Sequence, residues 1–252
     1  MRMKCCDDNS WYQNQLIKYD INIWVVELHR LTHSSNIYWD TLSADEKEKA
    51  LSFETKQLQK NYVTARGTLR SLLGSYVNMP PLNIQFIYNK QGKPKIDSHD
   101  SVFFNLAHSK DLAIIAFSKI AEVGIDLEYM DSAVDFISLS KLVMTSEEQA
   151  LFNSINEQQQ AETFYTNWTR KEAFVKGLGL GLQFDLKNCS VGVNNLPELK
   201  IHTKSQITSN DWSLNDIHLE DKPYKAAVAL RRNQIANYRT FYYQSKYEKQ
   251  FH

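Results

Sequence analysis

Apolar side chains occupy every second position between residues 123 and 128, and this period of two is typical of a β-strand. Gly124, Asp126 and Glu128 would then share one face, while the apolar side chains pack into the core from the other. The two carboxylates would lie about 6.5–7 Å apart at their Cα atoms, so both could reach one cation. Gly124 is expected to leave room for a ligand. The alternative interpretation is an edge strand whose acidic face is solvated.

A long amphipathic helix is predicted for residues 157–176, and Gly177 is expected to end it. Trp168, Glu172 and Lys176 are spaced by four residues and would form one stripe along this helix. An ordinary ion pair between Glu172 and Lys176 is the alternative explanation. Together with the strand, however, the helix supplies a third carboxylate close to a lysine. This combination indicates a hard divalent cation that holds a phosphorylated substrate.

Polar residues also follow the apolar segment that begins at residue 103. His108 and Ser109 stand at its end, where each could donate a hydrogen bond to a phosphate oxygen. Lys93 lies in a predicted rigid turn between Gly92 and Pro94. A structural histidine and a plain surface turn are the alternatives for these two features.

The composition is that of a globular protein, with 42% hydrophobic and 23% charged residues among 252. Lysine and arginine (29) balance aspartate and glutamate (29), which argues against a nucleic-acid or membrane binder. The N-terminus lacks the form of a signal peptide, and apolar stretches such as residues 112–117 are too short to span a bilayer. We therefore expect a cytoplasmic protein, whose three cysteines, Cys5, Cys6 and Cys189, are free thiols and form no zinc site.

The order of predicted elements is a strand, helices and strands, followed by helices and strands again, which indicates the α+β class. The two parts resemble loose copies of one plan, with a seam near residues 118–122. Residues 1–18 are polar and are expected to be loosely ordered. Strands are predicted for residues 22–28, 84–88, 102–106, 112–117, 122–129, 189–193, 212–219 and 224–230, and helices begin near residues 43, 60, 145 and 157.

Taken together, these segments resemble the 4′-phosphopantetheinyl transferase superfamily, in particular its larger monomeric type, which includes the activator of surfactin synthetase. The resemblance covers roughly residues 20–230. It rests on motifs in the following order: residues 65–70, Gly92 with Lys93 and Pro94, Asn105 with His108 and Ser109, Gly124 with Asp126 and Glu128, and Trp168 with Lys171, Glu172, Ala173, Phe174 and Lys176.

The resemblance implies two similar α+β halves that form a pseudo-dimer, with the active site in the cleft between them. Residues 1–120 would be the half that contacts the phosphates of coenzyme A, and residues 121–252 would carry the metal site and dock the carrier protein. The implied reaction moves 4′-phosphopantetheine from coenzyme A to a serine of an acyl or peptidyl carrier protein and releases adenosine 3′,5′-bisphosphate. Such carriers serve fatty-acid, polyketide or nonribosomal peptide biosynthesis. The implied cofactor is Mg²⁺, with Mn²⁺ as the alternative, and the implied state is a monomer.

The resemblance also implies roles for single residues. Asp126, Glu128 and Glu172 would bind the metal, and either Glu172 or a metal-bound water would take the proton of the serine. Lys176 would hold the pyrophosphate. The implied catalytic residues are Asp126, Glu172 and Lys176. The implied contacts to coenzyme A are His108 at the 3′-phosphate, supported by Lys93, Arg66 and Ser109, with Lys47 and Lys49 as further basic contacts. Ala107 stands where the family often has serine, so a modest effect on coenzyme A affinity is expected.

Two other functions are compatible with some of these residues. A Mg²⁺-dependent phosphohydrolase or nuclease could use the same three carboxylates, but the sequence shows no second metal cluster and no basic groove. A non-catalytic carrier-binding relative would have no chemical reason to keep the carboxylates together with Lys176. Met144 has two interpretations of equal weight, which are carrier docking and core packing. The glycine-rich residues 177–182 are interpreted as a helix end and a turn, because they lack the lysine of a P-loop.

Overall fold

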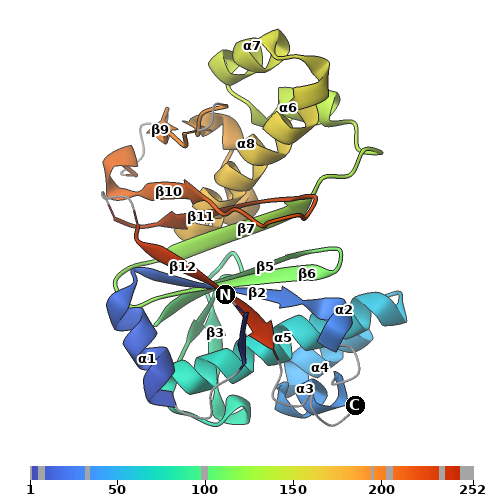
Figure 1. Cartoon of the computed structure of the whole chain (residues 1–252), viewed down its shortest axis with the longest axis vertical. Coiled ribbons are helices and arrows are strands. Elements are labelled where there is room, and N and C mark those ends of the chain that lie inside the picture. Colours follow the sequence, from blue (N-terminus) through green and yellow to red (C-terminus); the bar gives the residue numbers. More distant parts are fainter. Residues whose placement is uncertain are drawn as a thin grey trace. The chain divides into compact units, whose positions relative to one another are not determined.

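The computed structural model describes residues 2–4, 9–31, 35–97, 102–193, 196–202, 207–232 and 236–244, so Cys5 and Cys6 lie outside the described part. The chain forms two compact units (Figure 1). The first unit contains Met1–Ile87, Pro94–Ile120 and Asn237–His252, and the second contains Tyr88–Lys93 and Ala121–Ala236. Each unit is therefore assembled from separate stretches of the chain.

The first unit is built on a five-stranded sheet with the order β1-β12-β2-β6-β5. Its strands are β1 (Arg2–Lys4), β12 (Tyr238–Gln244), β2 (Ile21–Glu27), β6 (Leu112–Ser118) and β5 (Phe103–Ser109). β12 runs parallel to β2 and β1, whereas β2, β6 and β5 pair antiparallel. The sequence did not predict β12, which returns from the second unit to pair Tyr238 with Ile21.

Helices complete the first unit. They are α1 (Asn9–Lys18), α2 (Leu28–Leu31), α3 (Ser35–Thr41), α4 (Ala44–Leu51), the long α5 (Lys56–Val77) and the 3₁₀ helix η2 (Pro81–Asn83), with the short strands β3 (Phe86–Tyr88) and β4 (Pro94–Ile96) after them. α5 begins at the cap Thr55 and ends at Asn78, which adopts the left-handed conformation with φ 54°. Its buried Tyr76 accepts a 2.8 Å hydrogen bond from the indole of Trp24, which ties the helix to the sheet.

The expectation that residues 1–18 are loosely ordered is wrong for residues 9–18, whereas residues 1 and 5–8 lie outside the described part. Residues from Asn9 to Lys18 form helix α1. Tyr12 and Leu16, one turn apart, are buried in the core, and the Tyr12 ring stacks on Trp24 at a centroid distance of 5.8 Å. Among the described side chains of α1, these two buried residues at a spacing of four hold the helix on the core.

The second unit is built on a three-stranded antiparallel sheet with the order β10-β11-β7, against which α8 packs (Figure 1). Its main elements are β7 (Val123–Tyr129), α6 (Phe136–Val143), α7 (Ser146–Ser154), α8 (Glu157–Leu178), β10 (Ser213–Asp216) and β11 (Tyr224–Leu230). Smaller elements are η3 (Gly181–Gln183), η4 (Leu186–Asn188), β8 (Cys189–Ser190), β9 (Lys200–Ile201) and η5 (Ser209–Asp211). Phe174, Trp212 and Leu214 belong to the core between helix and sheet.

The predicted strand over residues 122–129 and the predicted long helix are both confirmed, but the helix does not end at Gly177. It continues to Leu178 and ends at Gly179, which has φ 69°. Gly177 lies inside the helix. A Cβ at this position would lie only 2.6 Å from the Trp212 ring. The glycine is therefore needed for close packing, and the next glycine provides the left-handed cap.

Both units use the same device to hold their long helix. In the first unit, Glu46 bonds the backbone N–H of Ser43 and also pairs with Arg66 and Arg70 of α5. In the second, Glu148 bonds the N–H of Thr145 and pairs with Lys171 of α8. In each case the glutamate of a helix-capping box is also the buried partner of a cation on the following long helix.

The predicted α+β class is confirmed, since both units combine helices with a sheet, which is mixed in the first unit and antiparallel in the second. The pseudo-dimer and the cleft between the halves stay predictions. No helix within the described ranges is both long enough and apolar enough to cross a membrane.

Candidate active site

The centre of the candidate site is the contact between β7 and α8. Gly124 of β7 faces the backbone of α8, and a Cβ at this position would lie 2.0 Å from the Ala173 carbonyl oxygen and 2.1 Å from the Gly177 nitrogen. The expectation that Gly124 leaves room for a ligand is therefore wrong, because the helix backbone fills that space. The absence of a side chain instead lets α8 approach the strand so closely that its side chains reach Asp126.

Asp126 is buried, with 2% of its surface exposed. Its Oδ1 accepts a hydrogen bond of 2.5 Å from the Lys176 ammonium group, whereas its Oδ2 has no hydrogen-bond partner among the described residues. Burial raises the pKa of Asp126, although the positive charge of Lys176 counteracts this. A buried carboxylate oxygen without a donor is unfavourable, so this oxygen is suited to bind a cation.

Glu172 and Glu128 lie in the same electrostatic environment. Burial and the charge of Asp126 raise the pKa of the half-buried Glu172, and Lys176 opposes them. For Lys176, burial lowers the pKa, but Asp126, Glu172 and Glu128 outweigh it and the pKa is raised. The three carboxylates therefore act on one ammonium group.

The donors fit a hard divalent cation by their chemistry, because all of them are carboxylate oxygens and one is buried without a partner. In the part of the chain that the structure describes, no three His, Cys, Asp or Glu side chains are arranged to hold a metal ion. The position beside Asp126 is taken by the Lys176 ammonium group, which compensates the buried negative charge. Joint metal binding by Asp126, Glu128 and Glu172 stays a prediction.

Lys93 belongs to the second unit and connects the start of β7 with the end of α8. Its ammonium group donates to Glu122 (2.5 Å), to the Gly177 carbonyl (2.8 Å) and to the Val123 carbonyl (3.3 Å). Burial lowers its pKa, and Glu122 partly compensates this effect. These partners lie on both elements that form the candidate site, so Lys93 fixes their ends to each other. Its contact to coenzyme A stays a prediction.

Replacing Lys93 by methionine should lower the free energy of unfolding by about 1–3 kcal/mol, because the Gly177 carbonyl and Glu122 lose a charged donor. The measurement is a urea unfolding curve. A Lys93→Met protein of unchanged stability would contradict the structural role.

The first unit contains the other residues implied in coenzyme A binding, and Arg66 already has a partner there. Its Nε donates to the carboxylate of Glu46, and its guanidinium group lies 4.4 Å from the ring centroid of Phe86. Burial raises the pKa of Glu46, but attraction to Arg66 and bonds from Ser43, Arg66 and Arg70 outweigh it and the pKa is lowered. Arg66 thus helps to hold α5, and its phosphate contact stays a prediction.

The remaining residues of this set lie at the surface of the first unit. His108 is exposed near the end of β5, and the following Ser109 is partly exposed. Lys47 lies 5.8 Å from the ring centroid of Trp39, and Lys49 lies 5.7 Å from that of Tyr62. Ala107 is buried, so it contributes no exposed group beside His108. The roles of these residues towards coenzyme A stay predictions.

Comparison with known proteins adds independent information. Residues 122–229, which contain both β7 and α8, match the model of the 4′-phosphopantetheinyl transferase superfamily. The 4′-phosphopantetheinyl transferase HetI of Nostoc sp. is 30% identical over 218 residues, which are 85% of this chain and 89% of that protein. The chain belongs to the 4′-phosphopantetheinyl transferase superfamily. A putative 4′-phosphopantetheinyl transferase of Synechocystis sp. is also 30% identical, over 79% of this chain and 82% of that protein.

A more distant similarity extends to animals. The human L-aminoadipate-semialdehyde dehydrogenase-phosphopantetheinyl transferase is 25% identical over 76% of this chain and 68% of that protein. The enzyme class is thus a phosphopantetheinyl transferase, which decides against the phosphohydrolase or nuclease considered from the sequence.

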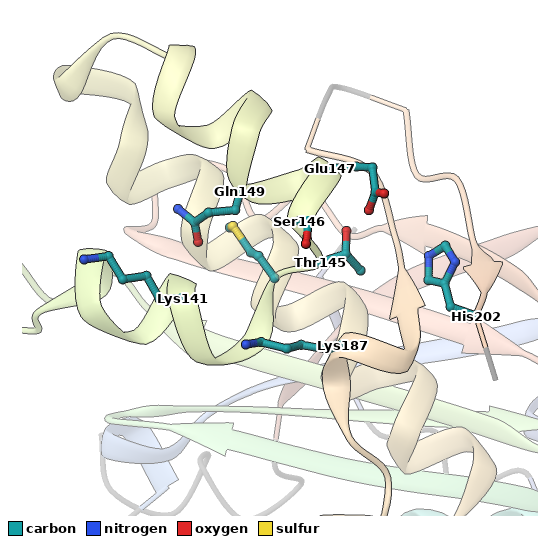
Figure 2. A pocket seen from close by; sticks show the side chains of 8 residues that line it. Lys141, Thr145, Ser146, Glu147, Gln149, Lys187 and His202 are labelled. Atoms are coloured by element: carbon teal, nitrogen blue, oxygen red, sulfur yellow. The ribbon is translucent and has the colours of Figure 1, made fainter.

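A pocket of about 470 Å³ opens in the second unit of this transferase, at the start of α7 (Figure 2). Figure 2 shows Lys141 of α6, Thr145 and the first turn of α7, Lys187 of η4 and His202 around it. Met144 also lines this pocket, but it is 2% exposed and packs in a core cluster with Phe152 and Phe164, so core packing accounts for it.

Cys189 of the transferase is a buried free thiol whose pKa is raised to about 12, chiefly by burial. Burial therefore disfavours the thiolate, which is the nucleophilic form of cysteine. The expectation that Cys189 is a free thiol is confirmed, and its side chain packs in the core of the second unit.

Proposed function

We propose that this enzyme transfers the 4′-phosphopantetheine group of coenzyme A to a serine of an acyl or peptidyl carrier protein, with Mg²⁺ as cofactor. The observation that carries the proposal is the buried, unpartnered Oδ2 of Asp126 next to Lys176 and Glu172. A bound cation would give this oxygen a partner, and a pyrophosphate is the substrate group that such a cation and a lysine would hold together.

In the proposed reaction, Asp126, Glu128 and Glu172 hold Mg²⁺, which would neutralise negative charge on the pyrophosphate. Lys176 holds a pyrophosphate oxygen as a point charge. The serine oxygen forms a bond to the β-phosphorus, the bond from that phosphorus to the bridging oxygen breaks, and adenosine 3′,5′-bisphosphate leaves. Glu172 accepts the serine proton directly or through a water.

The deciding experiment is the intact mass of a carrier protein after incubation with the enzyme, coenzyme A and Mg²⁺. We expect a gain of about 340 Da, the mass of one phosphopantetheine group added covalently, and its loss when a chelator is present. Adenosine 3′,5′-bisphosphate should appear in equal amount. Cleavage of coenzyme A without modification of any carrier would contradict the proposal, as would the absence of any mass gain with fatty-acid, polyketide and peptide carriers.

The resemblance implies that the second unit docks the carrier protein, and we expect Leu142, between the strand of Asp126 and helix α7, to take part. It is 66% exposed at the end of α6, whereas the adjacent Val143 and Met144 are buried. An exposed leucine at this place suits the apolar face of a partner helix.

Replacing Leu142 by glutamate should raise the KM for the carrier protein about tenfold, because an interface contact is lost and a charge is introduced. The KM for coenzyme A should not change. Leu182 offers a matched control, since it is fully exposed in the second unit and Leu182→Glu should leave both constants unchanged. Equal KM values for the carrier in Leu142→Glu and wild type would exclude Leu142 from docking.

A further inference from the structure

Lys171, the residue before Glu172, is a fully buried cation. Its ammonium group donates to the carbonyl oxygens of Val143 (2.8 Å), Leu186 (2.8 Å) and Cys189 (2.7 Å), and it lies 2.7 Å from Oε2 of Glu148. All three protons of the ammonium group therefore have acceptors in the interior. The motif that includes this lysine gave no indication of these partners.

Both carboxylate oxygens of Glu148 also have hydrogen-bond donors. Its Oε1 accepts from the Asn167 side chain (2.9 Å) and from the Val191 N–H (2.8 Å), and its Oε2 accepts from the Thr145 N–H (3.0 Å) as well as from Lys171. We call Glu148, Lys171 and their hydrogen-bond partners the Glu148–Lys171 cluster. It joins four segments, which are the end of α6, the start of α7, the stretch from η4 to residue 191, and α8.

The Glu148–Lys171 cluster fixes α8 where the proposed chemistry takes place. Asn167 and Lys171 are one turn apart on the helix, so two bonds to Glu148 restrain its rotation about its own axis. Glu172 follows Lys171 directly, and Lys176, one turn further on, holds Asp126. The corresponding Glu46 cluster of the first unit holds Arg66 and Arg70, which are followed by Gly67 and Ser71 and not by a carboxylate.

We infer that Lys171, through Glu148, is a positioning residue that aims the Glu172 carboxylate at the metal site. This inference rests on the proposed function. A group that orients a metal ligand typically changes metal affinity or activity by about 10–100-fold when it is removed. A residue that only contributed to stability would not change the metal affinity of the folded protein.

The same helix offers a matched control. Arg170 is also fully buried, and its guanidinium group makes two bonds to Asp216 (2.8 and 2.6 Å) and one to the Gly192 carbonyl (3.0 Å). Arg170→Met therefore removes a buried ion pair from α8 as Lys171→Met does. The position of Arg170 is about 200° around the helix axis from that of Glu172, whereas the position of Lys171 is about 100° from it.

The experiment measures binding of Mn²⁺ to the full chain in the presence of coenzyme A, by the electron paramagnetic resonance signal of the free ion. Lys171→Met should raise the Kd for Mn²⁺ by about 10–100-fold, and Arg170→Met should change it less than threefold. The double variant E148Q/K171M removes the carboxylate charge that the single variant leaves without its cation. It should recover thermal stability relative to Lys171→Met while its Mn²⁺ affinity stays weak.

The double variant could instead recover wild-type Mn²⁺ affinity together with stability. This result would show that the Glu148–Lys171 cluster is only structural and would overturn the inference. An equal loss of affinity in Arg170→Met would overturn it too, because any loosening of α8 would then suffice. Wild-type protein that binds no Mn²⁺ would instead refute the proposed metal site, and the inference with it.

Discussion

Replacing Asp126 by asparagine should reduce transfer to the carrier protein by about 10³-fold or more and should leave the protein at least as stable as wild type. The loss follows because a cation at a reacting phosphate is worth several kcal/mol, and about 1.4 kcal/mol corresponds to a factor of ten. Stability is kept because the wild-type carboxylate is buried with one oxygen unpartnered. A neutral amide costs less to bury, and the Lys176 side chain, 34% exposed, can turn to water.

Transfer is measured as the rate of the carrier mass gain at saturating Mg²⁺, and stability as the free energy of unfolding in urea. Asp216→Asn is the matched control in the same unit, because it also removes a carboxylate that pairs with a cation of α8. There the fully buried Arg170 loses its partner, so stability should fall by about 3 kcal/mol. Transfer per folded molecule should remain. Asp126→Asn protein that transfers within tenfold of wild type would refute the role of this carboxylate.

The two elements that form the site were predictable from the sequence because each has a strong period. The alternation around Asp126 and the four-residue spacing of Trp168, Glu172 and Lys176 determine which side chains share a face, and local geometry then preserves that relation. Backbone contacts between elements were not predictable in the same way. A glycine shows only that a side chain is missing, so the sequence could not reveal that α8, not a ligand, lies against Gly124.

The partners of the basic residues were also beyond the sequence. Lys93, Arg66 and Lys171 carry the charges that a phosphate site requires, yet each has a carboxylate or carbonyl partner within its own unit. A cation on an amphipathic helix is usually solvated, and long-range packing decides when it is buried instead. A capping-box glutamate ahead of a long helix could have indicated a buried cation on that helix. Both such glutamates, Glu46 and Glu148, pair with one.

Strand β12 and helix α1 were missed for a related reason. β12 is bounded by polar residues and pairs with strands more than 200 residues away in the sequence, so no local signal marks its place in the sheet. In α1, the described side chains that are buried in the core are those of Tyr12 and Leu16. In both cases the stabilising contacts are tertiary, and local propensity carries little information about them.

The second large effect is expected for Gly124→Ala. The new methyl group would lie 2.0 Å from the Ala173 carbonyl oxygen and 2.1 Å from the Gly177 nitrogen, and both are backbone atoms of α8. Because backbone cannot rotate away as a side chain can, the helix must move off the strand. Overpacking of this kind costs about 1–3 kcal/mol and occasionally more, and we expect about 3 kcal/mol or more here. The measurement is the urea unfolding curve followed by tryptophan fluorescence and by circular dichroism.

Activity should fall along with stability. A shift of α8 by about 1 Å displaces Glu172 and Lys176 from Asp126, and a misplacement of that size costs about 10²-fold in rate. Transfer should therefore be reduced even at a temperature where Gly124→Ala remains folded. Gly92→Ala provides the comparison, because its φ of 85° makes alanine strained while no atom lies within 4 Å of the new methyl group. It should cost only about 1–2 kcal/mol, so the larger loss in Gly124→Ala would come from the contact between helix and strand. If Gly124→Ala were as stable and as active as wild type, α8 would not lie against β7 at this residue, and the geometry proposed for Asp126, Glu172 and Lys176 would fail with it.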